Sequence, residues 1–237
     1  MGGMFKKIII VQARLGSHRL PEKVMAKIGN YTLIEILSKQ LDGLKQKGFE
    51  IAYAIPRDDF ALKKYLEGLN QIVVQGSEEN VFSRFQQVIE QYQPDAAVRI
   101  TGDCPFIDPD VIFKMCEDFI KNELDYITND EQYGGMPRGF DCEIIARKAW
   151  DRMAGQCLSA RNKEHCTSYI IDNRNEFKTG LYSIHLPKAE LKGIRLCVDT
   201  QQDLDYVRDI CKRLGDFSFP IFHDRIIDLI RTQSLWR

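Results

Sequence analysis

Three cations stand close together directly after the first apolar run of the chain. In VQARLGSHRLPEK, residues 11–23, they are Arg14, Arg19 and Lys23, and they stand among turn-forming residues. Recognition of a polyphosphate requires backbone N–H groups from a tight turn together with nearby cations. The alternative is a solvated loop whose cations make surface ion pairs. The stretch has neither the Walker pattern nor the glycine pattern of a dinucleotide site.

Two aspartates each end an apolar stretch and could bind a divalent cation. Asp103 stands in RITGDCPFIDPD and Asp199 in IRLCVDTQQDL. Carboxylate oxygens are preferred ligands of hard divalent cations, although either aspartate could instead cap a turn or a helix. Thr200 can cap the helix that follows. Asp203 would stand in the first turn of that helix, where the helix dipole favours negative charge, and this structural role is the one we expect for it.

Two further stretches could contact a substrate. QGSEENVFSR, residues 75–84, could close over a base or ribose, or merely cap a helix. RNKEHC, residues 161–166, places Arg161, Glu164 and His165 near a helix start. His165 could contact a substrate or carry a proton, and a structural histidine is the alternative.

The first half of the chain alternates between strands and helices. The expected strands are residues 6–12, 49–56, 71–75 and 95–100, and the expected helices are residues 32–47, 58–69, 80–92 and 108–120. Such alternation predicts a mainly parallel sheet with helices on both faces. Ligands of these sheets bind at the carboxyl ends of the strands. The basic loop, residues 13–23, and TGDCP, residues 101–105, both follow strands, so the cations and Asp103 should lie together.

The second half is less regular. Its turn-rich segment EQYGGMPRGF separates expected strands at 125–128 and 140–146. The other expected elements are a helix near 161–174, strands near 177–185 and 194–198, and helices at 201–214 and 221–232. The chain contains no internal repeat or linker. We therefore expect one domain over residues 1–237, with an insertion at about 130–190.

Composition excludes several classes of protein. The 237 residues are 44% hydrophobic and 28% charged, as in ordinary globular proteins. The net charge of −1 gives no support for binding nucleic acid or a membrane surface. No apolar stretch approaches the ~18 residues that span a bilayer. The seven cysteines form no C-x-x-C pair, which predicts reduced thiols and a cytoplasmic protein.

Six stretches in this order resemble the cytidylyltransferases that activate acidic sugars. These are the CMP-sugar synthetases for sialic acid and 3-deoxy-manno-octulosonate (KDO), and the resemblance is greatest to the spore coat polysaccharide biosynthesis protein F branch. The stretches are QARLGSHRLPEK, GSEENVFSRF, VRITGDCPFIDPDVI, FDCEIIARKAW, KEHCTSYI and VDTQQDLDYV. They run through residues 7–210. Together they are specific for the family but not for the substrate.

The resemblance implies a fold and two ligands. The fold is a three-layer α/β/α sandwich with a mainly parallel mixed sheet, the glycosyltransferase-A-like fold of nucleotide-diphospho-sugar transferases, and the ligands are CTP and Mg²⁺. The opening loop lacks the G-x-G-x-R pattern of sugar-1-phosphate nucleotidyltransferases and of the erythritol-phosphate cytidylyltransferases. This difference favours the acidic-sugar type.

The resemblance also implies roles for individual residues. Arg14, Lys23 and Asp103 would be catalytic, and Asp103 and Asp199 would bind the metal. The implied nucleotide-binding residues are Ala13, Arg14, Gly16, Ser17, Arg19, Lys23, Ser77, Asn80, Thr101 and Gly102. The implied acceptor region contains Arg138, Arg161, Glu164 and His165, each of which could equally be solvated surface.

The implied reaction is attack by an acceptor oxygen on the α-phosphate of CTP, with release of pyrophosphate. Its product would be a CMP-activated acidic sugar for a surface polysaccharide. The alternatives are transfer to a phosphate- or phosphonate-bearing acceptor, a glycosyltransferase of the same fold, and a nucleotide-binding protein without turnover. The insertion at about 130–190 resembles the part by which these enzymes dimerise, so the resemblance implies a homodimer.

Overall fold

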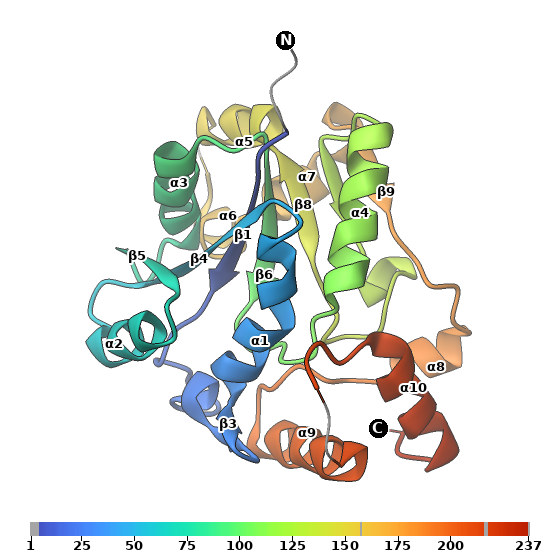
Figure 1. Cartoon of the computed structure of the whole chain (residues 1–237). Coiled ribbons are helices and arrows are strands. Elements are labelled where there is room, and N and C mark those ends of the chain that lie inside the picture. Colours follow the sequence, from blue (N-terminus) through green and yellow to red (C-terminus); the bar gives the residue numbers. More distant parts are fainter. Residues whose placement is uncertain (1–4, 157, 216–217, 237) are drawn as a thin grey trace.

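A seven-stranded sheet lies at the centre of the molecule (Figure 1). The computed structural model describes residues 5–156, 158–215 and 218–236. The strands are β1 (Lys7–Gln12), β4 (Phe49–Pro56), β5 (Ile72–Gly76), β6 (Ala96–Thr101), β7 (Tyr126–Thr128), β8 (Glu143–Ala146) and β9 (Thr179–Leu181). Their order is β5-β4-β1-β6-β8-β7-β9, and only β8 runs antiparallel to its neighbours. The expected mainly parallel mixed sheet is confirmed.

Helices cover both faces of this sheet (Figure 1). The longer helices are α1 (Leu33–Lys45), α2 (Phe60–Gly68), α3 (Val81–Tyr92), α4 (Pro109–Lys121), α5 (Arg147–Ala154), α9 (Gln201–Leu214) and α10 (His223–Thr232). On one face α1 packs beside α4. On the other face α3 meets α5, where the rings of Phe82 and Trp150 stack with centroids 4.4 Å apart. The result is the three-layer sandwich that the sequence predicts.

Shorter elements complete the chain. They are the hairpin of β2 (Lys27–Ile28) and β3 (Tyr31–Thr32), the helices α6 (Ala160–Glu164), α7 (Ser168–Asp172) and α8 (Lys188–Lys192), and the 3-10 turns η1 (Lys23–Met25), η2 (Glu131–Tyr133) and η3 (Arg174–Glu176). None of the described helices is long and apolar enough to cross a membrane.

Local sequence explains why the central elements form and where they begin. β1 reads KIIIVQ, and its four central apolar residues are buried, as expected for a parallel strand covered on both faces. Thr32 and Glu35 form a capping box at the start of α1. Asp108 caps α4, with Pro109 at its first position, as the sequence predicts.

The second half departs from the expected elements. The helix expected near 161–174 is divided into α6, α7 and η3. The strand expected at 194–198 is wrong, because this segment makes an isolated bridge and not a ladder. Arg195 bridges to Arg138, the Leu196 N–H donates to the Arg138 carbonyl at 2.8 Å, and the Val198 N–H donates to the Asp103 carbonyl at 2.9 Å. The segment passes the loops that contain Arg138 and Asp103 and does not pair along a strand. Helix α5 was not expected.

The cysteines agree with the sequence prediction where they are described. Six of them are free and buried, and Cys157 lies outside the described residues.

A buried carboxylate joins α4 to the C-terminal helix. Asp108 Oδ1 accepts the N–H groups of Asp110 and Val111 at 2.8 and 3.2 Å, and Oδ2 lies 2.8 Å from the His223 N–H and 2.6 Å from its Nδ1. Burial alone would raise the pKa of Asp108, but the hydrogen bonds from His223 outweigh it and hold the pKa below 3.8. Ionised Asp108 therefore stabilises the fold.

We expect Asp108→Asn to lower the free energy of unfolding at pH 7 by about 1–3 kcal/mol, because asparagine has one acceptor oxygen instead of two. The carboxylate's contribution is complete above pH 3.8 and is lost as the pH falls through the lower pKa of the folded state, so the difference should be smaller at pH 3 than at pH 7. Urea denaturation at both pH values measures it. Asp118→Asn, an exposed change on α4, is the control, and equal stability of Asp108→Asn and wild type would contradict the prediction.

Candidate functional site

The ends of β1 and β6 meet at one edge of the sheet. Gln12 and Thr101 pair in register, and the Gly102 N–H donates to the Gln12 carbonyl at 2.8 Å. A Cβ at Gly102 would lie 2.9 Å from the Ala13 Cβ, so only glycine allows this approach. The basic loop and the 101–105 loop are therefore neighbours, as the sequence predicts.

A cleft of about 600 Å³ opens between these loops. Its lining comes from the basic loop, the loop before α3, the end of β6, α6 and the segment before α9. The lining residues are Gln12, Ala13, Arg14, Ser17, His18, Arg19, Lys23, Val24, Glu78, Glu79, Val81, Arg84, Thr101, Gly102, Asp103, Ala160, Glu164, His165 and Asp199. Most of the sequence-predicted site residues are thus brought together.

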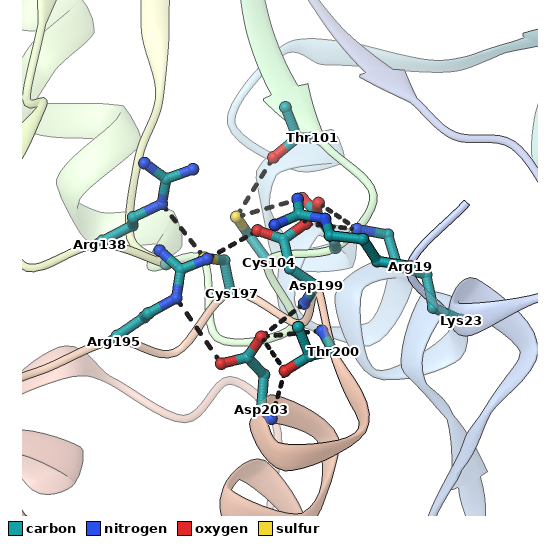
Figure 2. A network of polar contacts seen from close by, with 12 residues as sticks. Arg19, Lys23, Thr101, Cys104, Arg138, Arg195, Cys197, Asp199, Thr200 and Asp203 are labelled. Carbon is teal, nitrogen blue, oxygen red and sulfur yellow. Dashed lines mark hydrogen bonds and ion pairs between the residues drawn. The ribbon is translucent and has the colours of Figure 1, made fainter. Parts of the chain in front are cut away.

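Three cations neutralise the two aspartates of the cleft, and Figure 2 shows all three around Asp199. The Lys23 Nζ lies 2.7 Å from Asp103 Oδ2 and 3.0 Å from Asp199 Oδ1. A guanidinium nitrogen of Arg19 lies 2.8 Å from the same Asp199 Oδ1, and one of Arg195 lies 2.6 Å from Asp199 Oδ2. Both aspartates therefore present an oxygen to one point that already holds a positive charge.

The protonation of this cluster follows from its charges. Burial alone would lower the pKa of Lys23, but Asp103 and Asp199 outweigh it and raise the pKa above 10.5. Burial alone would raise the pKa of Asp199, but Lys23, Arg19 and Arg195 outweigh it and hold the pKa below 3.8. Lys23 and Asp199 are therefore both charged at neutral pH.

A capping box supports Asp199 from below. Thr200 Oγ1 accepts the Asp203 N–H, and Asp203 Oδ2 accepts the N–H groups of Asp199 and Thr200 at 3.0 and 2.8 Å. The structural role expected for Asp203 is confirmed, as is the cap at Thr200. The backbone at Asp199 is fixed by the start of α9.

The basic loop is held from outside the cleft. The Leu15 N–H donates to Asp59 Oδ2 at 2.8 Å, and the Ser17 N–H donates to the Leu15 carbonyl at 2.7 Å. A Cβ at Gly16 would lie 2.9 Å from Glu78 Oε1, which in turn lies 3.9 Å from an Arg14 nitrogen. The basic loop thus contacts the loop before α3. Gly16 does not line the cleft.

The loop before α3 contains Ser77 and Asn80, expected near the nucleoside. Neither lines the cleft, whereas their neighbours Glu78 and Glu79 do. Asn80 caps α3 by accepting the Ser83 N–H at 3.0 Å, and Ser77 Oγ accepts the Asn80 N–H at 3.1 Å. These two side chains shape the loop.

Arg84 holds this loop from beneath. Its side chain donates to the Ser77 carbonyl and, at 3.0 Å, to the Glu78 carbonyl. The residue is 2% exposed although it lines the cleft, and no carboxylate pairs with it in an ion pair that the structure describes. Within the described chain, its Nε is the one buried side-chain N or O atom that lacks a hydrogen-bond partner. Burial of an unpaired guanidinium costs free energy of folding, and this cost favours a functional role for Arg84 at the cleft.

The four residues expected to bind the acceptor do not gather at one place. Glu164 and His165 line the cleft, and both are exposed. Arg138 lies outside the lining but beside Arg195 (Figure 2), and its Nε donates to Cys197 Sγ at 3.3 Å. Arg161 also lies outside the lining, and its guanidinium pairs with Asp172 on the surface.

The two aspartates turn carboxylate oxygens toward each other's side of the cleft, and carboxylate oxygen is a ligand that Mg²⁺ prefers. Among the described residues, no group of three or more histidines, cysteines or acids could hold a metal ion. Mg²⁺ is often bound by one or two carboxylates together with the phosphates of a nucleotide. Asp103 and Asp199 fit that arrangement.

Sequence reasoning missed Arg195, Arg84 and Glu78. Arg195 stands four residues before Asp199, at a position that the expected strand gave no reason to single out. Arg84 stands four residues after Asn80, the cap of α3, and the sequence alone predicts an exposed side chain for an arginine at this position. The burial of Arg84 and the contacts of all three residues depend on tertiary structure.

Comparison with solved structures places the fold among the nucleotidyltransferases. A cytidylyltransferase from Leptospira borgpetersenii matches with a TM-score of 0.88 and 25% identity, over 98% of this chain and 96% of that one. A CMP:2-keto-3-deoxy-manno-octonic acid synthetase complexed with CTP matches with a TM-score of 0.66 and 15% identity, over 88% of this chain and 99% of that one. The second likeness supports the fold alone.

The chain belongs to the cytidylyltransferase family, whose model matches residues 8–218. It is 31% identical to the spore coat polysaccharide biosynthesis protein SpsF of Bacillus subtilis, over 88% of each chain. It is 29% identical to a 3-deoxy-manno-octulosonate cytidylyltransferase of Rickettsia bellii, over 51% of this chain and 50% of the relative. The family resemblance in the sequence is therefore confirmed, and the protein is a cytidylyltransferase.

We expect Arg84→Met to weaken CTP binding about tenfold or more, because the loop before α3 loses the charged donor that holds two of its carbonyls. The KM for CTP should rise more than kcat falls. Calorimetric titration with CTP and steady-state kinetics measure both. Glu90→Gln, on the exposed face of the same helix, is the control. Unchanged CTP affinity in folded Arg84→Met would contradict the prediction.

Proposed function

We propose that this cytidylyltransferase transfers CMP from CTP to an acidic sugar, with Mg²⁺ and with release of pyrophosphate, for a surface polysaccharide. The observation that carries the proposal is the meeting of Arg19 and Lys23 with Asp103 and Asp199 at the carboxyl edge of the sheet. The names of two relatives, a spore coat polysaccharide biosynthesis protein and a 3-deoxy-manno-octulosonate cytidylyltransferase, support the class of product.

The basic loop would bind the triphosphate. Arg14, Arg19 and Lys23 line the cleft, and their charges can neutralise the leaving pyrophosphate. Lys23 and Arg19 contact the two aspartates, and phosphate oxygens would compete for the same cations. The Ala13 and Ser17 backbone would follow the phosphates, with Thr101 and Gly102 beside Ala13.

Asp103 and Asp199 would hold Mg²⁺ at the point to which both turn an oxygen. A divalent cation at this point supplies charge neutralisation at the α-phosphate. The chain's own part is to fix the two carboxylates. The backbone does this for Asp103 through its carbonyl, which accepts the Val198 N–H, and for Asp199 through the cap of α9.

The nucleoside would lie against the loop before α3, which Ser77, Asn80 and Arg84 hold in shape. Glu164 and His165, at the end of α6, also line the cleft, so the acceptor would enter beside them. Either could remove the acceptor's proton. Arg138 is exposed beside Arg195 and could bind the acceptor's carboxylate. Arg161 already pairs with Asp172, so its contribution to acceptor binding would be smaller. Assembly as a homodimer through residues 130–190, in the cytoplasm, is part of the proposal.

The decisive experiment is pyrophosphate release with CTP and Mg²⁺ against a panel of sugar acids and phosphate-bearing acceptors. We expect release with a sugar acid, its loss when EDTA removes the metal, and a fall in turnover of about 10²–10³ in Asp103→Asn, by analogy with other charge-stabilising groups. Asp118→Asn, an exposed change on α4, is the control. Release only with a phosphate-bearing acceptor would refute the sugar acid, and release that persists without metal would refute the role of the two aspartates.

A further inference from the structure

The two carboxylate oxygens of Asp199 have different partners (Figure 2). Oδ1 receives Lys23 and Arg19, at 3.0 and 2.8 Å, and both cations come from the basic loop. Oδ2 receives only Arg195 among the ion pairs that the structure describes, at 2.6 Å. Lys23 also contacts Asp103, so Oδ1 is the oxygen on the Asp103 side. The Asp199 carboxylate thus turns Oδ1 toward the cations of the cleft and Oδ2 toward Arg195.

Arg195 differs from Lys23 and Arg19 in its access to a ligand. Lys23 and Arg19 line the cleft and can turn to the phosphates of a nucleotide, whereas Arg195 is not part of the lining. Its Nε also lies 3.6 Å from Asp203 Oδ1, within the cap of α9. Its backbone is held by the bridge to Arg138. A nucleotide in the cleft therefore leaves Arg195 in place.

We propose that Arg195 is a positioning residue that holds Asp199 by Oδ2 and so presents Oδ1 to the divalent cation that arrives with the nucleotide. The inference rests on the proposed function, because it assumes that Asp199 binds this cation. When phosphate oxygens draw Lys23 and Arg19 away, Arg195 becomes the remaining restraint on the rotation of the Asp199 carboxylate. Residues that hold a metal ligand in this way commonly contribute 10–100-fold to metal affinity, as an order-of-magnitude figure.

The geometry requires arginine at this position. A planar guanidinium can present separate nitrogens to two carboxylates, and here one nitrogen faces Asp199 and another faces Asp203. A lysine ammonium is a single point of charge on a flexible stem. Lysine at position 195 should therefore restore part of the charge but not the fixed orientation of Asp199.

The experiment measures binding of Mn²⁺ to the enzyme in the presence of CTP and without acceptor, by electron paramagnetic resonance. We expect Mn²⁺ affinity to fall about 10–100-fold in Arg195→Met and by a smaller factor in Arg195→Lys. CTP affinity measured by calorimetry in EDTA should stay within about twofold of wild type, because Arg195 is outside the cleft lining. Arg213→Gln, whose arginine pairs with Asp209 on the exposed side of α9, is the control and should bind Mn²⁺ as wild type does.

Three outcomes would overturn the inference. The first is unchanged Mn²⁺ affinity in Arg195→Met. The second is an equal loss of CTP affinity in EDTA, which would mean that Arg195 supports the whole cleft and not the metal ligand. The third is the absence of Mn²⁺ binding by wild type with CTP, which would also refute the proposed metal role of Asp199. If Arg195→Met does not fold, as judged by its thermal transition, Arg195→Lys alone carries the comparison.

Discussion

Two carboxylates held close together at the edge of a sheet repel each other, and the cleft depends on how that repulsion is offset. Lys23 bridges Asp103 and Asp199, while Arg19 and Arg195 contact Asp199 from other sides. Removal of Lys23, the most enclosed of the three cations, would leave the two carboxylates without the charge that lies between them. The surrounding backbone is arranged to keep the cluster together. Gly102 lets β1 and β6 bring their loops into contact, and the cap of α9 fixes the position from which Asp199 extends.

The same cluster relates the resting cleft to the proposed reaction. A divalent cation would place positive charge between the two aspartates, as Lys23 does. Phosphate groups would place negative charge against the basic loop, as the aspartates do. Binding can then proceed as an exchange of partners within a fixed frame of charges. An exchange of this kind needs little rearrangement of the main chain. Electrostatic preorganisation is the term that most often dominates transition-state stabilisation in such enzymes.

The sequence predicts those parts of the molecule that short-range rules control. The alternation of apolar strands with capped amphipathic helices predicts the order of elements from β1 to α4, and the rule for carboxyl ends places Asp103 beside the basic loop. The capping signals at Asp108 and Thr200 are also local and were read correctly. The strand predicted at residues 194–198 is wrong. An apolar stretch predicts a strand whether it joins a sheet or only passes two loops. Only the tertiary contacts of Val198 and Arg195 distinguish the two.

For the same reason, the side chains that support the site escaped sequence reasoning. Nothing in the spacing of Arg84 or Arg195 separates an arginine that other residues hold in place from a solvated one. Their roles follow from what surrounds them in three dimensions.

The contact between Lys23 and Asp199 joins residues 176 positions apart, and it has a consequence for synthesis of the protein. A chain growing from the ribosome exposes Lys23 well before Asp199, which is added 176 residues later. Until then Lys23 and Asp103 can meet, but the cleft lacks one of its two acidic walls. Nucleotide that recognises the complete cleft would bind only a chain that includes Asp199, and its binding would stabilise that chain by an amount that grows with the logarithm of ligand concentration. Cellular nucleotide would thus favour chains with a complete cleft over shorter nascent ones.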